Sequence, residues 1–247
     1  MKIEFMGKIS ANENQVCVMT DQGPWKVLSV SDKIASFIYS PQIRNRFKDV
    51  DMIFGCGDID YYYLEFMVSS LDVPLFYVRG NHDKVVEYTG PVQRTAPGGG
   101  IDLHRKLINY KGLLLGGVEG SLRYRPGQFQ YSQDEMWRHV WSLVPGLMVN
   151  KMRYGRYLDV FISHAPPLGI HDDDDLPHQG IKAFRWLVHI FQPAYYFHGH
   201  VHIYRPDSPR ISLIGKTKII NTFYFQETLV DLHAEDHQFL DLTPPAP

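Results

Sequence analysis

The sequence of 247 residues lacks several features that mark particular classes of protein. It has only two cysteines, Cys17 and Cys56, which allow at most one disulfide and favour reduced structural thiols. It has no run of about 18 apolar residues, the length that a membrane-spanning helix needs. Its first ten residues include Glu4 and lack the apolar core of a signal peptide. We therefore expect a cytoplasmic protein with no membrane partner.

The chain also lacks an excess of charge of either sign. Its 25 Lys and Arg against 27 Asp and Glu give a formal net charge of −2. Such a balance predicts no general attraction to nucleic acid or anionic lipid. No basic stripe of the kind that follows a nucleic-acid backbone is present, so a nucleic-acid polymer is not an expected partner. The composition does not indicate an oligomeric state.

What is present fits one large α/β domain. Hydrophobic residues make up 44% of the chain and charged residues 21%, as in ordinary globular proteins. There is no internal repeat and no stretch with the composition of a linker, so we expect a single domain over residues 1–247. The informative motifs lie between about residues 26 and 225. The proline-containing end, residues 242–247, is expected to be a loose tail.

Hydrophobic patterning predicts the order of the elements. Residues 2–20 alternate like short strands, and a strand–helix–strand–helix–strand series follows, which implies parallel strands with right-handed crossovers. The strands of that series are expected within 25–32, 49–58 and 74–83, and its helices within 36–47, broken at Pro41, and 61–71. Beyond it we expect a loop over 88–100, a strand at 111–118, a helix over 133–150 interrupted near Pro145, strands within 157–164 and 194–199, a helix at 181–191, and closing antiparallel strands at 217–225 and 228–232.

Polar residues stand at the ends of five of these strands. They are Asp32, Asp58, Gly80–Asp83, His164 and Gly199–His202. In α/β sheets, functional groups gather beyond the carboxyl ends of the strands, so these residues are expected to meet at one edge. A mixed set of carboxylate, amide and imidazole ligands suits Mn, Fe, Zn or Ni and argues against Ca or Mg alone.

The same residues can serve two metal ions. In extended backbone His200 and His202 point to the same side, so each can reach a different metal. A carboxylate such as Asp58 can bridge two cations. Two metals about 3.5–4 Å apart are a common arrangement for hydrolysing phosphate esters.

This series of blocks, G-D, G-N-H-D, S-H-A-P-P and H-G-H-V-H, resembles the calcineurin-like metallophosphoesterases from about Lys26 to Phe225. The resemblance implies a four-layer αββα sandwich of two mixed β-sheets flanked by helices. It places Asp32 and His202 on the first metal and makes Asp58 the bridging ligand. The remaining roles that it implies are Asn81, His164 and His200 as ligands of the second metal, and His82, oriented by Asp83, as the acid that protonates the leaving oxygen.

The chain departs from the family at one ligand. Where the family has D-x-H, the sequence reads Asp32-Lys33-Ile34, so an isoleucine replaces a metal-binding histidine. Lys33 is not an obvious substitute, because extended backbone would turn it away from Asp32. Water could complete the first site. We therefore expect one tight and one weak metal site.

Several residues at the rim have alternative interpretations. Arg123 and Arg125 lie in a loop that could lean over the site, and a guanidinium matches phosphate oxygens; the alternative is a solvated charge. Asp172–Asp175 could add metal ligands but fit better a solvated acidic loop. His171 and His178, which flank that loop, could touch substrate.

The expected function is a metal-dependent phosphoesterase that acts on a phosphomonoester or a small phosphodiester. A metal-bound hydroxide would attack phosphorus, and His82 would protonate the leaving group. One alternative is a catalytically impaired scaffold that keeps the fold for binding, since Ile34 weakens the first site. Another is a nuclease or cyclic-nucleotide phosphodiesterase. The natural substrate, the preference for mono- or diesters and the native metal are not indicated by the sequence.

Overall fold

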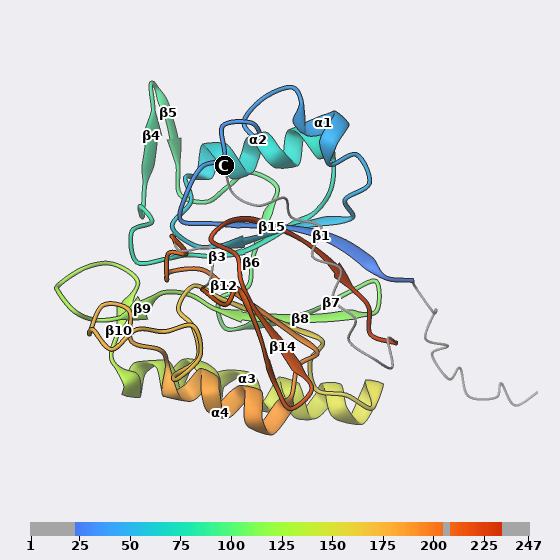
Figure 1. The fold of residues 1–247 in the computed structure, drawn as a ribbon, viewed down its shortest axis with the longest axis vertical. Coiled ribbons are helices and arrows are strands. Elements are labelled where there is room, and N and C mark those ends of the chain that lie inside the picture. The colour runs from blue at the N-terminus through green and yellow to red at the C-terminus, as the bar shows by residue number, and fades with distance from the viewer. Residues whose placement is uncertain (1–22, 205–207, 234–247) are drawn as a thin grey trace, which may run out of the picture.

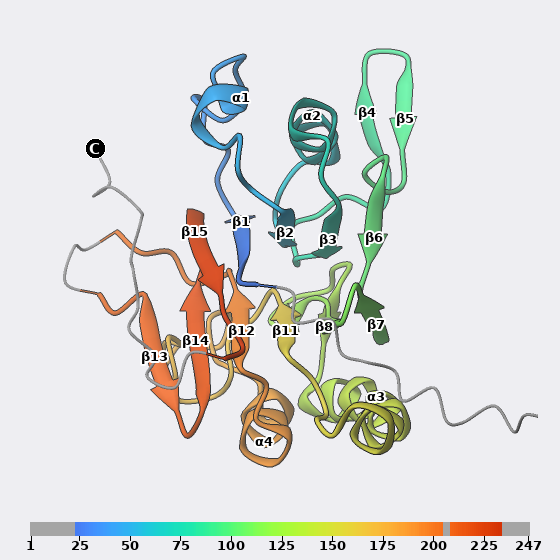
Figure 2. The ribbon, with the colours of Figure 1, turned by 90° about the vertical axis from the view of Figure 1, so that its right-hand side faces the viewer.

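The computed structural model describes residues 23–204 and 208–233, in which two β-sheets pack face to face (Figures 1 and 2). The first sheet has the order β15-β1-β2-β3-β6 and the second the order β13-β14-β12-β11-β8-β7. The strands of the first sheet are β1 (Trp25–Ser31), β2 (Met52–Cys56), β3 (Leu75–Val78), β6 (Gly100–Asp102) and β15 (Tyr224–Val230). Those of the second are β7 (Lys106–Tyr110), β8 (Leu113–Val118), β11 (Val160–Ser163), β12 (Tyr195–His198), β13 (Ile211–Ile214) and β14 (Thr217–Asn221).

Helices cover the outer faces of both sheets. Helices α1 (Ile43–Arg46) and α2 (Tyr61–Leu71) lie over the first sheet, and α3 (Gln133–Tyr154) and α4 (Lys182–Phe191) lie over the second (Figure 2). Two small ribbons complete the described chain: β4 (Glu87–Thr89) with β5 (Val92–Arg94), and β9 (Ser121–Leu122) with β10 (Gln130–Tyr131). The expected αββα sandwich is confirmed.

Apolar side chains fill all three interfaces between the four layers. Between the sheets, Phe54 of β2 packs edge-to-face on Phe197 of β12, with ring centroids 5.1 Å apart. Aromatic pairs of this geometry add to the stabilisation that comes from burying their area. Separate clusters join α1 and α2 to the first sheet and α3 and α4 to the second. Each sheet is thus held on both faces.

Parallel pairing brings the strand ends together. In the first sheet β1, β2 and β3 are parallel, as the strand–helix alternation predicts. In the second sheet β8, β11, β12 and β14 are parallel as well. The carboxyl ends of the strands within each sheet therefore meet at one edge, which is where the polar motifs follow.

The expected helices differ from the observed ones in two places. The segment 36–47 forms turns and then the short α1 beyond Pro41. The expected interruption near Pro145 is wrong, because α3 continues through it to Tyr154. A proline removes one helical hydrogen bond, but α3 has a capping box between Ser132 and Glu135, and residues before and after Pro145 bury one continuous face.

Local patterning also missed strands whose pairing is distant in sequence. The expected loop over 88–100 contains the β4–β5 hairpin, and it ends where β6 begins beside β3. The carboxylate of Glu65 fixes this region by accepting from the Arg94 guanidinium at 2.5 Å and from the Gly98 amide at 2.8 Å. These contacts come from α2, so the residues of the segment alone do not indicate them.

The expected closing strand over 217–225 is divided between the two sheets. Its first part, β14, pairs parallel with β12 and antiparallel with β13. Its last residues begin β15, which pairs antiparallel with β1 in the other sheet. The chain thus crosses between the sheets at Thr222 and Phe223.

Some sequence-based expectations lie outside the described residues. They are the short strands over 2–20, the state of Cys17 and the tail at 242–247. Among the described residues, no helix has both the length and the apolar character to cross a membrane. The single-domain organisation stays a prediction.

Candidate metal centre

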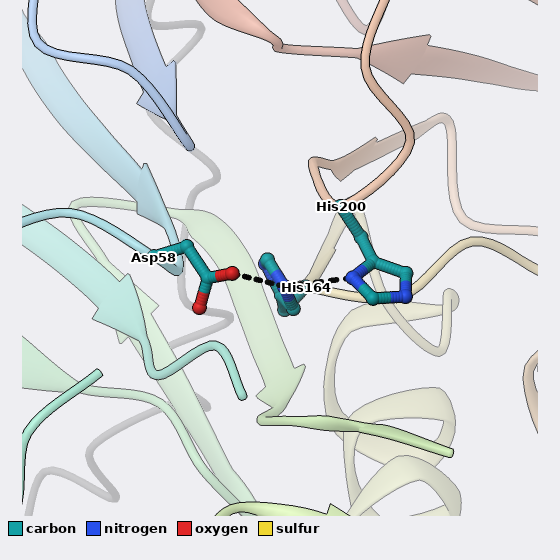
Figure 3. Close-up of side chains that lie close together, drawn as sticks. All are labelled: Asp58, His164 and His200. Carbon is teal, nitrogen blue, oxygen red and sulfur yellow. Dashed lines mark hydrogen bonds and ion pairs between the residues drawn. The ribbon is translucent and has the colours of Figure 1, made fainter. Parts of the chain in front are cut away.

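Four polar side chains converge where strands of both sheets end. Asp58 follows β2, Asn81 follows β3, His164 follows β11 and His200 follows β12. The Nε2 atom of His164 lies 3.0 Å from Asn81 Oδ1, 3.1 Å from His200 Nδ1 and 3.3 Å from Asp58 Oδ2. Figure 3 shows Asp58 and His200 on either side of the His164 ring. We call these four residues the tetrad.

The backbone around the tetrad requires glycine. Gly57 and Asp58 both have left-handed conformations, with φ of 85° and 54°. A Cβ atom on Gly80 would lie 2.1 Å from Asp58 Oδ1, which no side chain could tolerate. The G-D and G-N-H-D motifs therefore let two loop backbones approach closely enough for Asp58 and Asn81 to share one site.

Backbone carbonyls fix the tautomers of the two histidines. His164 Nδ1 lies 2.9 Å from the Cys56 carbonyl oxygen, and His200 Nε2 lies 2.7 Å from that of Pro177. A carbonyl oxygen only accepts, so each of these ring nitrogens donates its hydrogen. In the neutral rings, His164 Nε2 and His200 Nδ1 are then unprotonated. Together with the oxygens of Asp58 and Asn81, they direct four lone pairs toward one another.

Four lone pairs at such distances repel one another unless a cation lies among them. Burial acts to lower the pKa of His164, but the Asp58 carboxylate outweighs it and raises that pKa to about 9. Burial acts to raise the pKa of Asp58, and its interaction with His164 lowers it to about 2. Burial and the charge on His164 lower the pKa of His200 to about 4. A proton on His164 thus occupies the place that a metal ion would take.

The donor set of the tetrad fits a transition-metal ion. Asp58, His164 and His200 each offer a ligand atom, and these atoms lie within 4.8 Å of one another. Two imidazoles, a carboxylate and an amide oxygen suit Mn, Fe, Zn or Ni. The carbonyls of Cys56 and Pro177 orient the two rings, as partners of metal-binding histidines commonly do.

The residues expected at the first metal lie beside the tetrad. Asp32 Oδ1 is 3.6 Å from His202 Nε2, and the Asp32 carboxylate accepts from the backbone amide of His200 at 3.0 Å. Asp32 and His200 have φ of 63° and 70°, so the expectation of extended backbone at both positions is wrong. Left-handed turns, and not strand alternation, direct His200 toward the tetrad and His202 toward Asp32.

A pocket of about 320 Å³ opens beside these residues. Its wall includes Lys33 and Ile34, and the Lys33 ammonium lies 5.2 Å from the centre of the Tyr224 ring, so the expectation that Lys33 does not replace the missing ligand stays a prediction. The chain turns at Asp32, where the Lys33 amide donates to the Ser31 carbonyl at 2.6 Å. Ile34, which replaces the histidine of the D-x-H motif, presents an apolar side chain to the same pocket.

The two residues expected to form the catalytic acid lie at this pocket. The backbone amide of His82 donates to Asp58 Oδ1 at 2.7 Å, and the residue is exposed. Asp83 accepts from the amides of Gly80 at 2.7 Å and Ile59 at 3.0 Å. Among the described residues Asp83 has no hydrogen bond to the His82 ring, so its proposed orienting role stays a prediction. Burial and the nearby Asp58 charge raise the pKa of Asp83 to about 7.

The two candidate arginines have different surroundings. Arg123 pairs with Glu135 at 2.8 Å and donates to the Gln130 carbonyl, which holds it against the start of α3. Arg125 stacks over the Tyr124 ring, with its guanidinium carbon 5.3 Å from the centroid. The residue between them reaches the tetrad: Tyr124 Oη lies 3.4 Å from Asn81 Nδ2. Sequence reasoning missed Tyr124, although its position between the two arginines was a signal.

The loop over 168–180 covers His200. Its Pro177 carbonyl accepts from His200, and the ring of His178 lies 5.4 Å from that of His200. His171 does not face the pocket; its Nδ1 lies 3.0 Å from Nε2 of the buried His198. Asp173, Asp175 and His178 form a group with the spacing of metal ligands, but both aspartates are exposed.

Comparison with solved structures relates this fold to known ones. A crystal structure with 17% sequence identity matches with a TM-score of 0.58, covering 83% of this chain and 95% of its own. The crystal structure of TT1561 of Thermus thermophilus, at 14% identity, matches with a TM-score of 0.56, covering 86% of this chain and 96% of its own. At such identities the likeness concerns the fold alone. No curated protein matches the chain.

The sequence itself gives the family. The calcineurin-like phosphoesterase family matches residues 30–204, a range that contains the tetrad, Asp32, His82 and His202. This match covers more than half of the chain and agrees with the two sheets and the converging ligands described above. The chain therefore belongs to the calcineurin-like phosphoesterase family.

Proposed function

We propose that this protein is a metal-dependent phosphoesterase whose principal metal site is the tetrad of Asp58, Asn81, His164 and His200. The observation that carries the proposal is the convergence of the Asp58, Asn81 and His200 ligand atoms on His164 Nε2. A divalent metal held there supplies a Lewis acid for a phosphoryl oxygen and makes water nucleophilic near neutral pH. From the types of its ligands, we propose that this metal is Mn, Fe, Zn or Ni.

Asp58 links the metal site to the pocket. One carboxylate oxygen, Oδ2, faces His164, and the other accepts from the His82 amide. This second contact fixes the backbone of the residue proposed as the general acid. The exposed imidazole of His82 is free to approach a leaving-group oxygen and to donate its proton.

The pocket itself suits a small phosphate ester. Two lysines, Lys33 and Lys84, lie on its wall beside five carboxylates, those of Asp32, Asp58, Asp60, Asp83 and Glu87, so the positive charge for a phosphate group would come mainly from bound metal. The positive charge of Lys84 is partly compensated by Asp60, whose Oδ1 atom lies 3.5 Å from the Lys84 ammonium nitrogen. A volume of about 320 Å³ is within the range of pockets that hold small molecules.

The test is hydrolysis of nitrophenyl phosphate and bis-nitrophenyl phosphate by protein stripped of metal. Mn, Fe, Zn and Ni are added back separately. The proposal predicts that activity returns with at least one of these metals. The relative rates with the two esters then show which ester is preferred. Folded protein that hydrolyses neither ester with any of the metals would contradict it.

Ile34→His provides a test of the weak site. A histidine at 34 adds a nitrogen ligand to Asp32 and His202, so we expect the number of ions retained after dialysis to rise from about one to about two per chain. Inductively coupled plasma mass spectrometry measures this directly. Ile34→Gln serves as the control, because it adds a polar group without an imidazole. Two equally retained ions in the wild-type protein would contradict the proposed asymmetry.

The second candidate function is a binding scaffold. It is favoured by a specific observation, namely the apolar side chain of Ile34 in the pocket where a ligand would otherwise lie. A scaffold would bind metal at the tetrad without hydrolysing either ester. The hydrolysis assay and the metal analysis together separate the two functions.

A further inference from the structure

Helix α3 is apolar on two opposite faces. The inner face buries Met136, Val140, Leu143 and Leu147 against the second sheet. The outer face carries Trp141, Pro145, Met148 and Met152, at spacings of four, three and four residues that place them along one line of the helix. Trp141 is 54% exposed, Met148 48% and Met152 78%. A surface helix ordinarily presents polar residues to water on that side.

The apolar surface continues onto α4. The ring of Trp186 lies 5.1 Å from that of Trp141 and 5.4 Å from that of Trp137. Ile190, one turn further along α4, is 48% exposed. Figure 2 shows α3 and α4 side by side beneath the second sheet. We define the outer face of these helices as Trp141, Met148, Val149, Met152, Trp186 and Ile190.

Beyond the first turn of α3, the charged residues of these two helices are all basic. The only carboxylates of the two helices are Asp134 and Glu135, in the first turn of α3. From residue 136 onward the helices carry five cations and no acidic residue: Arg138, Lys151, Arg153, Lys182 and Arg185. Among the residues that the structure describes, none of the five forms an ion pair. This basic surface stands out in a chain whose net charge is −2.

We propose that the outer face of α3 and α4 docks on the surface of an anionic phospholipid bilayer. Exposed tryptophan and methionine side chains would enter the boundary between headgroups and acyl chains, while the flanking Lys and Arg contact the anionic headgroups. The 22 residues of α3 extend about 33 Å, and its apolar line runs along the helix as a ridge that suits lying in the plane of the surface.

The charge pattern argues against a second copy of this chain as the occupant. A symmetric dimer through this face would bring the same cations toward each other, which is unfavourable. A bilayer that contains phosphatidylglycerol supplies the opposite charge together with an apolar phase. Docking through the helices would leave the pocket accessible, because the pocket lies at strand ends and not over the outer face of the second sheet.

The test is co-sedimentation of the full chain with vesicles. We expect binding to vesicles of 70% phosphatidylcholine and 30% phosphatidylglycerol, weaker binding to pure phosphatidylcholine, and loss of binding as NaCl is raised. Absence of binding to the anionic vesicles at low salt would overturn the proposal.

Two pairs of substitutions locate the surface. Met148→Ser/Met152→Ser removes apolar contact, and Arg138→Gln/Arg153→Gln removes charge; each is expected to weaken vesicle binding about tenfold. The matched controls are Tyr88→Ser, at a side chain that is 69% exposed on the β4–β5 hairpin, and Arg44→Gln/Lys48→Gln near α1. Equal binding by the test variants and their controls would overturn the proposal, provided that circular dichroism shows all of them folded.

Size-exclusion chromatography with light scattering tests whether a second copy of this chain covers the outer face instead. A wild-type dimer that Met148→Ser/Met152→Ser converts to monomer would assign the face to a second copy and overturn the lipid proposal. The same particle mass for the wild type and this variant, together with the loss of vesicle binding, would support it. Vesicle binding and particle mass are both measured without any esterase assay, so these results do not depend on the proposed function.

Discussion

Asp58→Asn is expected to lower phosphoester hydrolysis about a thousandfold while the protein remains folded. Asp58 supplies the only carboxylate of the tetrad, so the substitution removes its negative charge and weakens metal binding. Asparagine has nearly the same shape, and its side-chain oxygen can still accept from the His82 amide, which Asp58 Oδ1 does at 2.7 Å. The measurement is kcat/KM with the metal that best restores activity, together with the affinity for that metal.

The control for this variant is Asp49→Asn. Asp49 is an exposed carboxylate near β2 whose partner is Lys26, at 2.8 Å. Its substitution should leave hydrolysis and metal affinity unchanged. Activity of Asp58→Asn within a few fold of wild type would show that this carboxylate is not a ligand in the reaction.

His82→Gln is expected to lower hydrolysis by about 10²–10⁴-fold for esters with poor leaving groups. The proposed role of His82 is to protonate the departing oxygen, and an alkoxide needs that proton far more than nitrophenolate does. The loss should therefore be much smaller with nitrophenyl phosphate than with an alkyl phosphate. Metal affinity should stay near that of the wild type, because the imidazole is not part of the tetrad.

His189→Gln, at an exposed position of α4, is the matched control for that variant. A loss of equal size for good and poor leaving groups would count against the role as a general acid. It would instead favour a role for His82 in positioning the substrate.

Much of the fold follows from local patterns. Tyr61–Leu71 is the helix that the sequence predicts, and β1, β2 and β3 are parallel as the alternation with helices implies. Each is a continuous apolar strand or an amphipathic helix, so the residues themselves carry the signal. The prediction fails where pairing depends on distant residues, as it does for β6, which lies beside β3.

The residue types of the site could be predicted, but its geometry could not. The G-D, G-N-H-D and G-H-x-H motifs indicate which side chains follow strand ends. Asp32 and His200 both have left-handed backbone conformations, which strand alternation does not describe. The carbonyls of Cys56 and Pro177, which fix the tautomers, have no sequence signature because any residue offers a carbonyl.

Averaged composition also conceals the basic surface of α3 and α4. A net charge of −2 predicts no attraction to anionic lipid, yet cations gather on two helices that carry acidic residues only in the first turn of α3. Only the fold places α4 beside α3 and shows which of their apolar residues remain exposed. The charge of individual helices is therefore a better guide to attraction by anionic lipid here than the net charge of the whole chain.

The most direct test of the account is the metal content of the dialysed protein. After incubation with Mn, Fe, Zn or Ni and dialysis against metal-free buffer, we expect about one tightly retained ion per wild-type chain and a second that dialysis removes. His200→Gln, shown to be folded by circular dichroism, should retain almost none. Wild-type protein that retains no more metal than His200→Gln would contradict the tetrad as a metal site.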